Sequence, residues 1–416
     1  MENYTVVLFI LAIMIGLSAM ADRIKIPYPI LLIVAGIAIG FMPTLPKISI
    51  DPEIIFLIFL PPLLYDAAFN ISLNDFKTQI NTIGTLAVTL VFLTTLGIAA
   101  VAYYLIPGIT WPLAFVLGAI LSATDAVAAM SITKGLGLSH KTNTILEGES
   151  LINDASALVA YRFAIAAATG TAFVFWDAAW QFILLLGGGF LVGFMMGRAT
   201  LILKFIKNNS IVIVSFLLLL PFVTYLVAEE FHVSGVIAVV VLGFSVSFLS
   251  SPVFPEHLKN QSRNIWDIII FMLNGLIFIL IGLQFPYVLK NIPADKVGPY
   301  ILHAFIITVV TLLIRMLRVF TQKANLQKAF SKQKRRINPE ALLDFRNSLI
   351  ISWSGMRGIV SLAIAIGIPE KLADGSPFPL RNEIIFISVA VVLFTLLGQG
   401  LTLPFIVKKL ARKPKD

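Results

Sequence analysis

Apolar segments of about 20 residues recur along this whole chain, and about 20 is the number of residues a helix needs to cross a bilayer. The 416 residues are 58% hydrophobic and 13% charged, and their mean hydropathy is +0.94. A soluble domain carries about twice that charged fraction. The composition therefore predicts an all-α polytopic membrane protein, with no room in this sequence for a folded soluble domain.

Thirteen of the apolar segments are predicted to be membrane-spanning helices. Their centres lie near Leu11, Val34, Phe59, Leu90, Leu121, Ala157, Leu191, Leu219, Val241, Leu276, Val309, Val360 and Leu393. With the N-terminus outside, 24 of the 31 Lys and Arg residues fall in inside segments, five fall outside, and Arg162 and Arg357 lie within spans. This asymmetry follows the positive-inside rule and predicts a cytoplasmic C-terminus.

The net charge of +9 does not indicate nucleic-acid binding, because the basic residues follow the topology and no nucleic-acid-binding module accompanies them. The longest polar connection, which contains Lys332, Lys334, Arg335 and Arg336, is predicted to be a cytoplasmic loop near anionic membrane lipid. A regulatory docking site is the alternative. The absence of cysteine excludes disulfides and thiolate metal sites.

The segment from Leu146 to Arg162 places ionisable groups within an apolar stretch. On a helix, Ser150 and Asp154 share one face, and Glu149 and Asn153 share the neighbouring face. A carboxylate deep in a bilayer costs several kcal/mol unless it is paired, hydrated or neutralised, so Asp154 is the first candidate functional residue. The alternative is a helix end whose carboxylates lie among lipid headgroups.

Two spans are predicted to be interrupted near the middle of the membrane. The fifth span contains Thr124 and Asp125, and transporters often break such helices to present backbone carbonyls and helix dipoles to an ion. Asp125 is expected to neutralise the N-terminus of one half-helix, and Thr124 to offer an oxygen ligand to a hard cation. An intact helix is the alternative. In the twelfth span, Gly355 and Gly358 flank an arginine and suggest a second interruption.

That arginine, Arg357, needs a buried partner, because an unpaired guanidinium in lipid is prohibitively costly. Glu149 is the predicted partner, with Arg162 competing for it.

The third span contains Pro61 and Pro62, and proline frees carbonyls that a cavity or a neighbouring helix must satisfy. Asp66 follows, and it either lines a cation path or ends the helix at the cytoplasmic surface.

Glycines recur in the seventh span at Gly187, Gly188, Gly189, Gly193 and Gly197, and this spacing permits close helix packing. Internal packing and a dimer contact are both open interpretations.

Four sequence words stand in the order found in one family of membrane proteins. They are FLPPLLYDAAF at 59–69, SATDAVA at 122–128, GESLIND at 148–154 and SWSGMRG at 352–358. Together they resemble the sodium/proton exchanger family, in its cation/proton antiporter-1 branch. The resemblance implies an inverted-repeat fold with two interrupted crossing helices, and a homodimer. It also implies that a core bundle, including roughly residues 83–170 and 297–408, moves against a scaffold including roughly residues 4–69 and 178–284.

The resemblance also implies roles for single residues. It makes the Glu149–Arg357 pair structural and places Asp66 on the cytoplasmic approach to the site. Asn153 before Asp154, in place of a second aspartate, resembles the electroneutral branch, in which one carboxylate alternates between a proton and one cation.

The leading hypothesis is a secondary active antiporter of the cell (inner) membrane, not an enzyme, that exchanges one sodium or lithium ion for one proton. Ion binding is assigned to Asp154, Thr124, Ser150 and Asp66, with sodium at Asp154, Thr124 and Ser150 and with Asn153 and Asp125 in support. No ATP-binding motif G-x-x-x-x-G-K-[ST] occurs, so an ion gradient must supply the energy, and no cofactor is expected. A potassium/proton antiporter is the main alternative, because residue types do not separate the two ions. A cation channel and an intramembrane aspartyl protease are the further alternatives.

Overall fold

The computed structural model describes residues 3–24, 26–42, 52–133, 135–170, 175–205, 210–250, 256–331, 338–372 and 375–411. Within these ranges the chain is helical, apart from turns, loops and one isolated antiparallel bridge between Lys371 and Pro377. The predicted all-α class is therefore confirmed. The basic residues Lys332, Lys334, Arg335 and Arg336 lie outside the described ranges.

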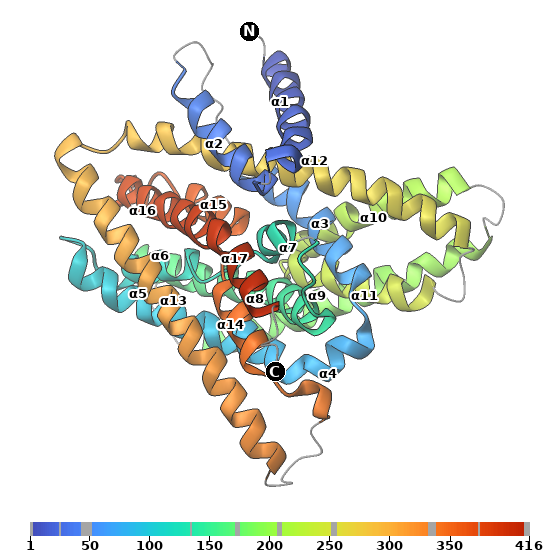
Figure 1. Ribbon diagram of the computed structural model, residues 1–416. Coiled ribbons are helices and arrows are strands. Elements are labelled where there is room, and N and C mark those ends of the chain that lie inside the picture. Colours follow the sequence, from blue (N-terminus) through green and yellow to red (C-terminus); the bar gives the residue numbers. More distant parts are fainter. Residues whose placement is uncertain are drawn as a thin grey trace. The chain divides into compact units, whose positions relative to one another are not determined.

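The chain divides into two compact units (Figure 1). Unit 1 comprises Met1–Ser49, Lys77–Thr171 and Gly275–Asp416. Its elements are α1 (Asn3–Ile24), α2 (Tyr28–Gly40), most of α4 (Leu73–Gly84), the π-helical turn η1 (Thr85–Thr89), α5 (Leu90–Leu105), α6 (Trp111–Ile120), α7 (Ala126–Thr133), α8 (His140–Ala168), the end of α12 (Glu256–Leu289), α13 (Ala294–Ser331), the short η3 (Pro339–Ala341), α14 (Phe345–Trp353), α15 (Ile359–Ile366), α16 (Arg381–Phe394), the π-helical turn η4 (Thr395–Gln399) and α17 (Gly400–Ala411).

Unit 2 comprises Ile50–Phe76 and Ala172–Asn274. Its elements are α3 (Pro52–Asn70), α9 (Phe175–Ala199), η2 (Thr200–Phe205), α10 (Ser210–Glu230), α11 (Gly235–Ser250) and the first part of α12. Helix α11 packs against both α9 and α3, and α10 packs against α11 and α3.

Helix α8 lies in the interior of unit 1, where it packs against α6, α5 and η1. Helix α13 packs along α5, α14 and α16. A cluster of buried apolar side chains joins these helices, and its members include Leu90 of α5, Leu146 of α8, Val319 of α13 and Ile351 of α14. Burial of this apolar surface stabilises the packing of α8 against the two short helices beside it, α7 and α14.

Seven helices within the described residues are long and apolar enough to cross a membrane. They cover residues 73–105, 140–168, 183–202, 211–230, 260–289, 294–331 and 381–410, and shorter apolar helices lie between them. Twelve of the thirteen predicted span centres fall within helices, and Leu121 falls in the connection between α6 and α7. The number of crossings stays a prediction.

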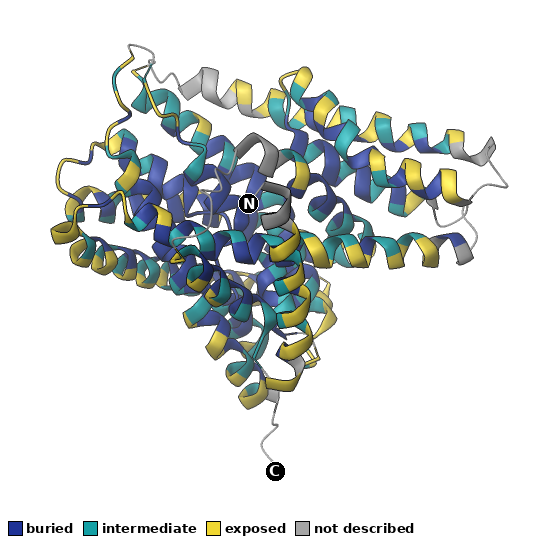
Figure 2. Ribbon diagram, turned by 90° about the horizontal axis from the view of Figure 1, so that it is seen from above, coloured by how far each residue is buried: buried dark blue, intermediate teal, exposed yellow. Residues whose placement is uncertain are grey.

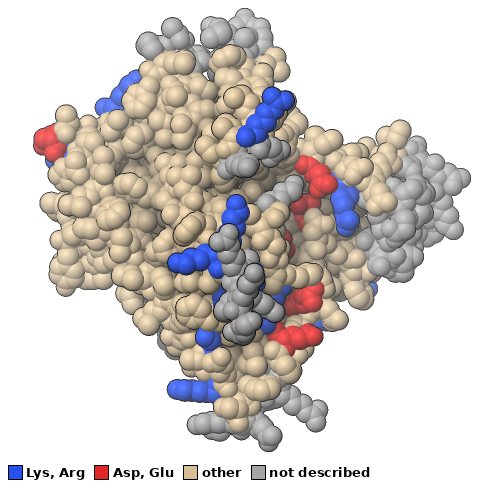
Figure 3. Space-filling model, viewed as in Figure 1, with Lys and Arg blue, Asp and Glu red and all other residues tan. Residues whose placement is uncertain are grey.

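Large apolar side chains are exposed along one face of α13. Leu302, Phe305, Val309, Leu313 and Leu317 follow the helical repeat, and each is more than a third exposed. Exposed positions lie along the outer faces of several other long helices as well (Figure 2). Charged side chains are sparse on the face shown in Figure 3. Exposed apolar faces on long apolar helices are suited to contact with lipid, as in a multi-pass membrane protein.

The predicted core and scaffold do not coincide with the two units. The family resemblance places roughly residues 4–69 in the scaffold, whereas the structure groups Met1–Ser49 with unit 1. The division into moving and static helices stays a prediction.

The glycines of α9 permit close packing within the chain. A Cβ atom added at Gly189 or Gly193 would overlap a backbone carbonyl of the α11 segment, and one added at Gly197 would overlap Ser245 of α11. Gly187, in contrast, has nothing within 4 Å of such an atom. These glycines therefore let α9 and α11 approach each other, which is the internal-packing interpretation.

We expect Gly193→Ala to destabilise the protein, because the added methyl group overlaps the Ala238 carbonyl oxygen and forces α9 away from α11. Overpacking of this kind costs about 1–3 kcal/mol. Gly187→Ala is the matched control and should be neutral or slightly stabilising. Thermal unfolding in detergent measures both variants, and equal melting temperatures would contradict the packing described here.

Candidate functional site

The fifth predicted span is interrupted between α6 and α7, at residues 121–125, which we call the first break. The hydroxyl of Ser122 donates to the Ala119 carbonyl at 2.7 Å, where α6 ends. The carboxylate of Asp125 then accepts the backbone N–H groups of Val127 at 2.9 Å and Ala128 at 3.2 Å, which caps the start of α7. The predicted interruption, and the position of Asp125 at a half-helix N-terminus, are confirmed.

The twelfth predicted span is interrupted between α14 and α15, at residues 354–358, which we call the second break. The two breaks cross. The backbone N–H of Asp125 donates to the Met356 carbonyl at 2.8 Å. Gly358 lies against the Asp125 side chain, so closely that a Cβ atom would overlap the carboxylate. Glycine at position 358 therefore allows the two interrupted helices to meet at Asp125.

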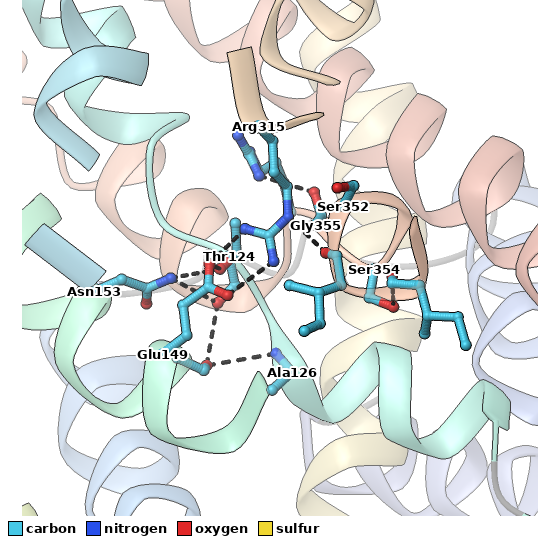
Figure 4. A network of polar contacts seen from close by, with 12 residues as sticks. Thr124, Ala126, Glu149, Asn153, Arg315, Ser352, Ser354 and Gly355 are labelled. Atoms are coloured by element: carbon cyan, nitrogen blue, oxygen red, sulfur yellow. Dashed lines mark hydrogen bonds and ion pairs between the residues drawn. The ribbon is translucent and has the colours of Figure 1, made fainter. Parts of the chain in front are cut away.

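Side chains of α8 hold the first break in place (Figure 4). The Thr124 hydroxyl donates to Glu149 Oε1 at 3.1 Å and accepts from the amide nitrogen of Asn153. The Ser150 hydroxyl donates to the Thr124 carbonyl at 3.1 Å and accepts from the backbone N–H of Ala126 at 3.4 Å. Both oxygens of Thr124 are thus oriented by α8.

The ion pair of Glu149 differs from the prediction. Arg315 of α13 binds both oxygens of its carboxylate: Nη1 contacts Oε1, and Nη2 donates to Oε2 at 2.8 Å. Arg315 Nε also donates to the Ile351 carbonyl at 3.0 Å, so each of the three guanidinium nitrogens has a hydrogen-bond partner. Gly355 makes room for it, because a Cβ atom there would overlap the Arg315 side chain.

The predicted Glu149–Arg357 pair is therefore wrong. Arg357 is buried in the second break, where its Nη1 donates to the Gly355 carbonyl at 2.8 Å. Its backbone N–H donates to the Thr395 hydroxyl at 3.0 Å. Within the described residues its Nε has no hydrogen-bond partner. The carbonyl freed where α14 ends gives this cation an acceptor, and the helix dipole there favours positive charge.

Arg315 is the partner of Glu149 that sequence reasoning missed. The eleventh predicted span is centred near Val309, which places Arg315 in an inside polar segment. In the structure α13 continues to Ser331, which puts Arg315 in the middle of the helix. The available signal was the run of mostly apolar residues directly before it, from Val309 to Ile314, because an arginine that follows such a run within one helix needs a buried anion.

Asp154 lies on α8 and is only 7% exposed. Within the described residues, no N–H or O–H group donates a hydrogen bond to its carboxylate. Ser150 lies one turn earlier on the same helix, and Asp125 is close enough to interact with it electrostatically. The structure thus brings together Asp154, Ser150, Thr124, Asn153 and Asp125, and leaves a buried carboxylate without a donor among them.

Asp66 belongs to unit 2, whereas the other site residues belong to unit 1. It accepts a hydrogen bond from the Asn70 side chain at 2.9 Å and lines a pocket with Tyr65, Arg263 and Trp266. Its role on a cation path stays a prediction.

Comparison with known proteins gives a consistent result. A family model described as "Sodium/hydrogen exchanger, transmembrane" matches residues 8–409. The "Sodium, potassium, lithium and rubidium/H(+) antiporter" of Bacillus pumilus is 37% identical over 421 residues, which cover 98% of this chain and 62% of the relative. The chain thus spans less than two thirds of that relative's length. The "Na(+)/H(+) antiporter NhaH" of Halobacillus aidingensis is 31% identical, with 97% of each chain covered.

Among solved structures, the sodium proton antiporter MjNhaP1 from Methanocaldococcus jannaschii matches with a TM-score of 0.75. The match covers 99% of this chain and 100% of the other, at 19% identity. At 19% sequence identity, this structural similarity shows that the two chains share a fold.

We expect Arg315→Gln and Glu149→Gln each to lower the melting temperature strongly, because each leaves one charge buried without its partner. Breaking a buried pair costs about 3–5 kcal/mol. The double variant should cost less than the sum of the two. Lys328→Gln, at an exposed position on α13, is the control. Thermal unfolding of all four variants in detergent measures the coupling; a double variant that costs the full sum of the two single variants would contradict this pairing.

Proposed function

The chain belongs to the sodium/hydrogen exchanger family, and we propose that it exchanges sodium or lithium ions for protons across the cell membrane, as a secondary active transporter. The observation that carries this proposal is the buried carboxylate of Asp154. It lies in unit 1 with the oxygens of Ser150 and Thr124, where two interrupted helices cross.

The oxygen donors fit a small hard cation. Such ions prefer carboxylate, carbonyl and hydroxyl oxygens. Asp154 supplies the negative charge, and Thr124 and Ser150 supply neutral oxygens. Because a buried carboxylate needs a positive partner, Asp154 binds either the cation or a proton, and one excludes the other. This competition couples the two fluxes.

Exchange of one cation for one proton follows from the single alternating carboxylate. Asn153 is neutral, and its amide donates to the Thr124 hydroxyl. Asp125 is occupied as the cap of α7, through the N–H groups of Val127 and Ala128. Asn153 and Asp125 therefore position the first break, while Asp154 carries the ions.

Cation binding at Thr124 requires a rearrangement of local hydrogen bonds. The Thr124 carbonyl accepts from Ser150 at 3.1 Å, and its hydroxyl is already used by Asn153 and Glu149. A cation that takes the carbonyl oxygen must displace the Ser150 donor or share the oxygen with it. The Glu149–Arg315 pair keeps Thr124 in place during this exchange.

Potassium is the second candidate cation. The printed name of the Bacillus pumilus relative includes potassium and rubidium beside sodium and lithium. Ionic radius is selected by the size of the cavity rather than by ligand type, so the same residues serve either ion.

The proposal includes a homodimer, which the family resemblance implies. It also includes an external N-terminus and a cytoplasmic C-terminus, supported by the distribution of Lys and Arg residues.

Transport is tested with purified protein in proteoliposomes that hold a proton gradient. Sodium, lithium or potassium is added outside, and an internal pH dye follows the gradient with the membrane potential clamped and then left free. We expect sodium and lithium to dissipate the gradient equally fast in both conditions. A potential-dependent rate would contradict one-for-one exchange. Cation flux without proton movement would contradict antiport and favour a channel.

Asp154→Asn should abolish exchange, because asparagine can neither bind a proton nor supply the charge that the cation needs. The variant should remain folded, since an amide removes a buried charge rather than exposing one. Asp295→Asn, at an exposed position of α13, is the matched control and should exchange normally. The same dye assay measures both variants, and residual exchange by Asp154→Asn above protein-free liposomes would contradict the role of Asp154.

A further inference from the structure

Helices α2 and α12 form a tightly packed pair within unit 1. A Cβ atom at Gly36 would overlap the backbone of Ile279, and one at Gly282 would overlap the backbone of Ile33. The two backbones are thus in direct contact at these glycines. Interlocked backbones do not slide easily past one another, so this pair is a fixed support.

Tyr28 lies at the first turn of α2, where that support meets α7. Its hydroxyl lies 3.3 Å from the Ser131 hydroxyl of α7, within hydrogen-bond distance. Its ring packs edge-on against Phe278 of α12, with the ring centroids 6.3 Å apart. Tyr28 therefore contacts both the support and the half-helix.

Helix α7 has only eight residues, and its position determines the geometry of the first break. Thr124 and Asp125 immediately precede it, and the Asp125 carboxylate caps its first turn. A rotation or shift of α7 displaces these two residues together. At the other end of α7, the Ser131 hydroxyl lies within hydrogen-bond distance of the Tyr28 hydroxyl, and Ile132 lies near Gly400 of α17.

We propose that Tyr28 is a positioning residue, which holds α7 through its hydrogen bond with Ser131 and so favours one of the two access states of the carrier. This inference rests on the proposed antiport function. A carrier must present its site to each side of the membrane in turn, so the break has to move relative to some fixed support. The Tyr28–Ser131 contact joins the break to a support that glycine packing immobilises, and it therefore forms in one state and opens in the other.

The expected effect of losing this contact follows from the strength of one hydrogen bond. Removing a neutral hydrogen bond changes a two-state equilibrium about two- to tenfold. The apparent affinity for a ligand scales with the population of the state that can bind it. Loss of the contact should therefore change the half-saturating sodium concentration in opposite directions on the two faces of the membrane.

The test compares Tyr28→Phe, Ser131→Ala and the double variant in proteoliposomes with oriented protein. Each single variant should shift the half-saturating sodium concentration about two- to tenfold, with opposite signs on the two faces. The double variant should shift it no further than either single variant, because both remove the same bond. Tyr104→Phe and Ser331→Ala remove exposed hydroxyl groups and serve as matched controls. Same-sign shifts, additive shifts, or shifts equal to those of the controls would overturn the proposal.

A second measurement does not depend on transport. The chain contains no cysteine, so Met130→Cys introduces a single reactive thiol on α7. In membrane vesicles, the rate at which a water-soluble maleimide labels this thiol should change about two- to tenfold when Tyr28→Phe is added, and not when Tyr104→Phe is added. An unchanged rate overturns the positioning role. If the labelling rate changes while the unmodified protein shows no exchange with any cation, the positioning role stands and the antiport function fails.

Discussion

The pair of Glu149 and Arg315 is the interaction on which the rest of unit 1 depends. Both charges are almost fully buried, and each would be very costly without the other. Arg315 extends from α13 to the end of α14, where it also binds the Ile351 carbonyl. The carboxylate of Glu149, held by Arg315, accepts a hydrogen bond from the Thr124 hydroxyl and so fixes the position of Thr124. One ion pair therefore ties α13, α14 and α8 to the first break.

The two breaks are stable because the backbone groups they release are satisfied locally. The Asp125 carboxylate caps α7, its N–H bonds the Met356 carbonyl, and Arg357 takes the carbonyl of Gly355. Asp154 is the exception, because no group in the described part of the chain donates to its carboxylate. The backbone groups named above have partners, whereas the carboxylate that is proposed to carry ions has no donor among the described residues.

Much of this arrangement was predictable from the sequence. Hydropathy indicated the helical class, and Thr124, Asp125 and the glycines around Arg357 indicated both interruptions, because polar and small residues stand out in apolar helices. The partner of Glu149 was not predictable from spacing, since Arg315 is 166 residues away and the contact depends on how α13 packs against α14 and α8. The glycines of α9 were ambiguous for a related reason: the same spacing serves an internal or an external partner, and only the position of α11 decides between them.

The central claim is that sodium and a proton compete for one carboxylate, Asp154. The most direct test is a calorimetric titration of sodium into the detergent-purified protein, repeated in two buffers with different ionisation enthalpies. The account predicts that the observed heat depends on the buffer, with a slope that corresponds to about one proton released per sodium ion bound. Saturable sodium binding with the same heat in both buffers would contradict it, because the cation would then bind without displacing a proton.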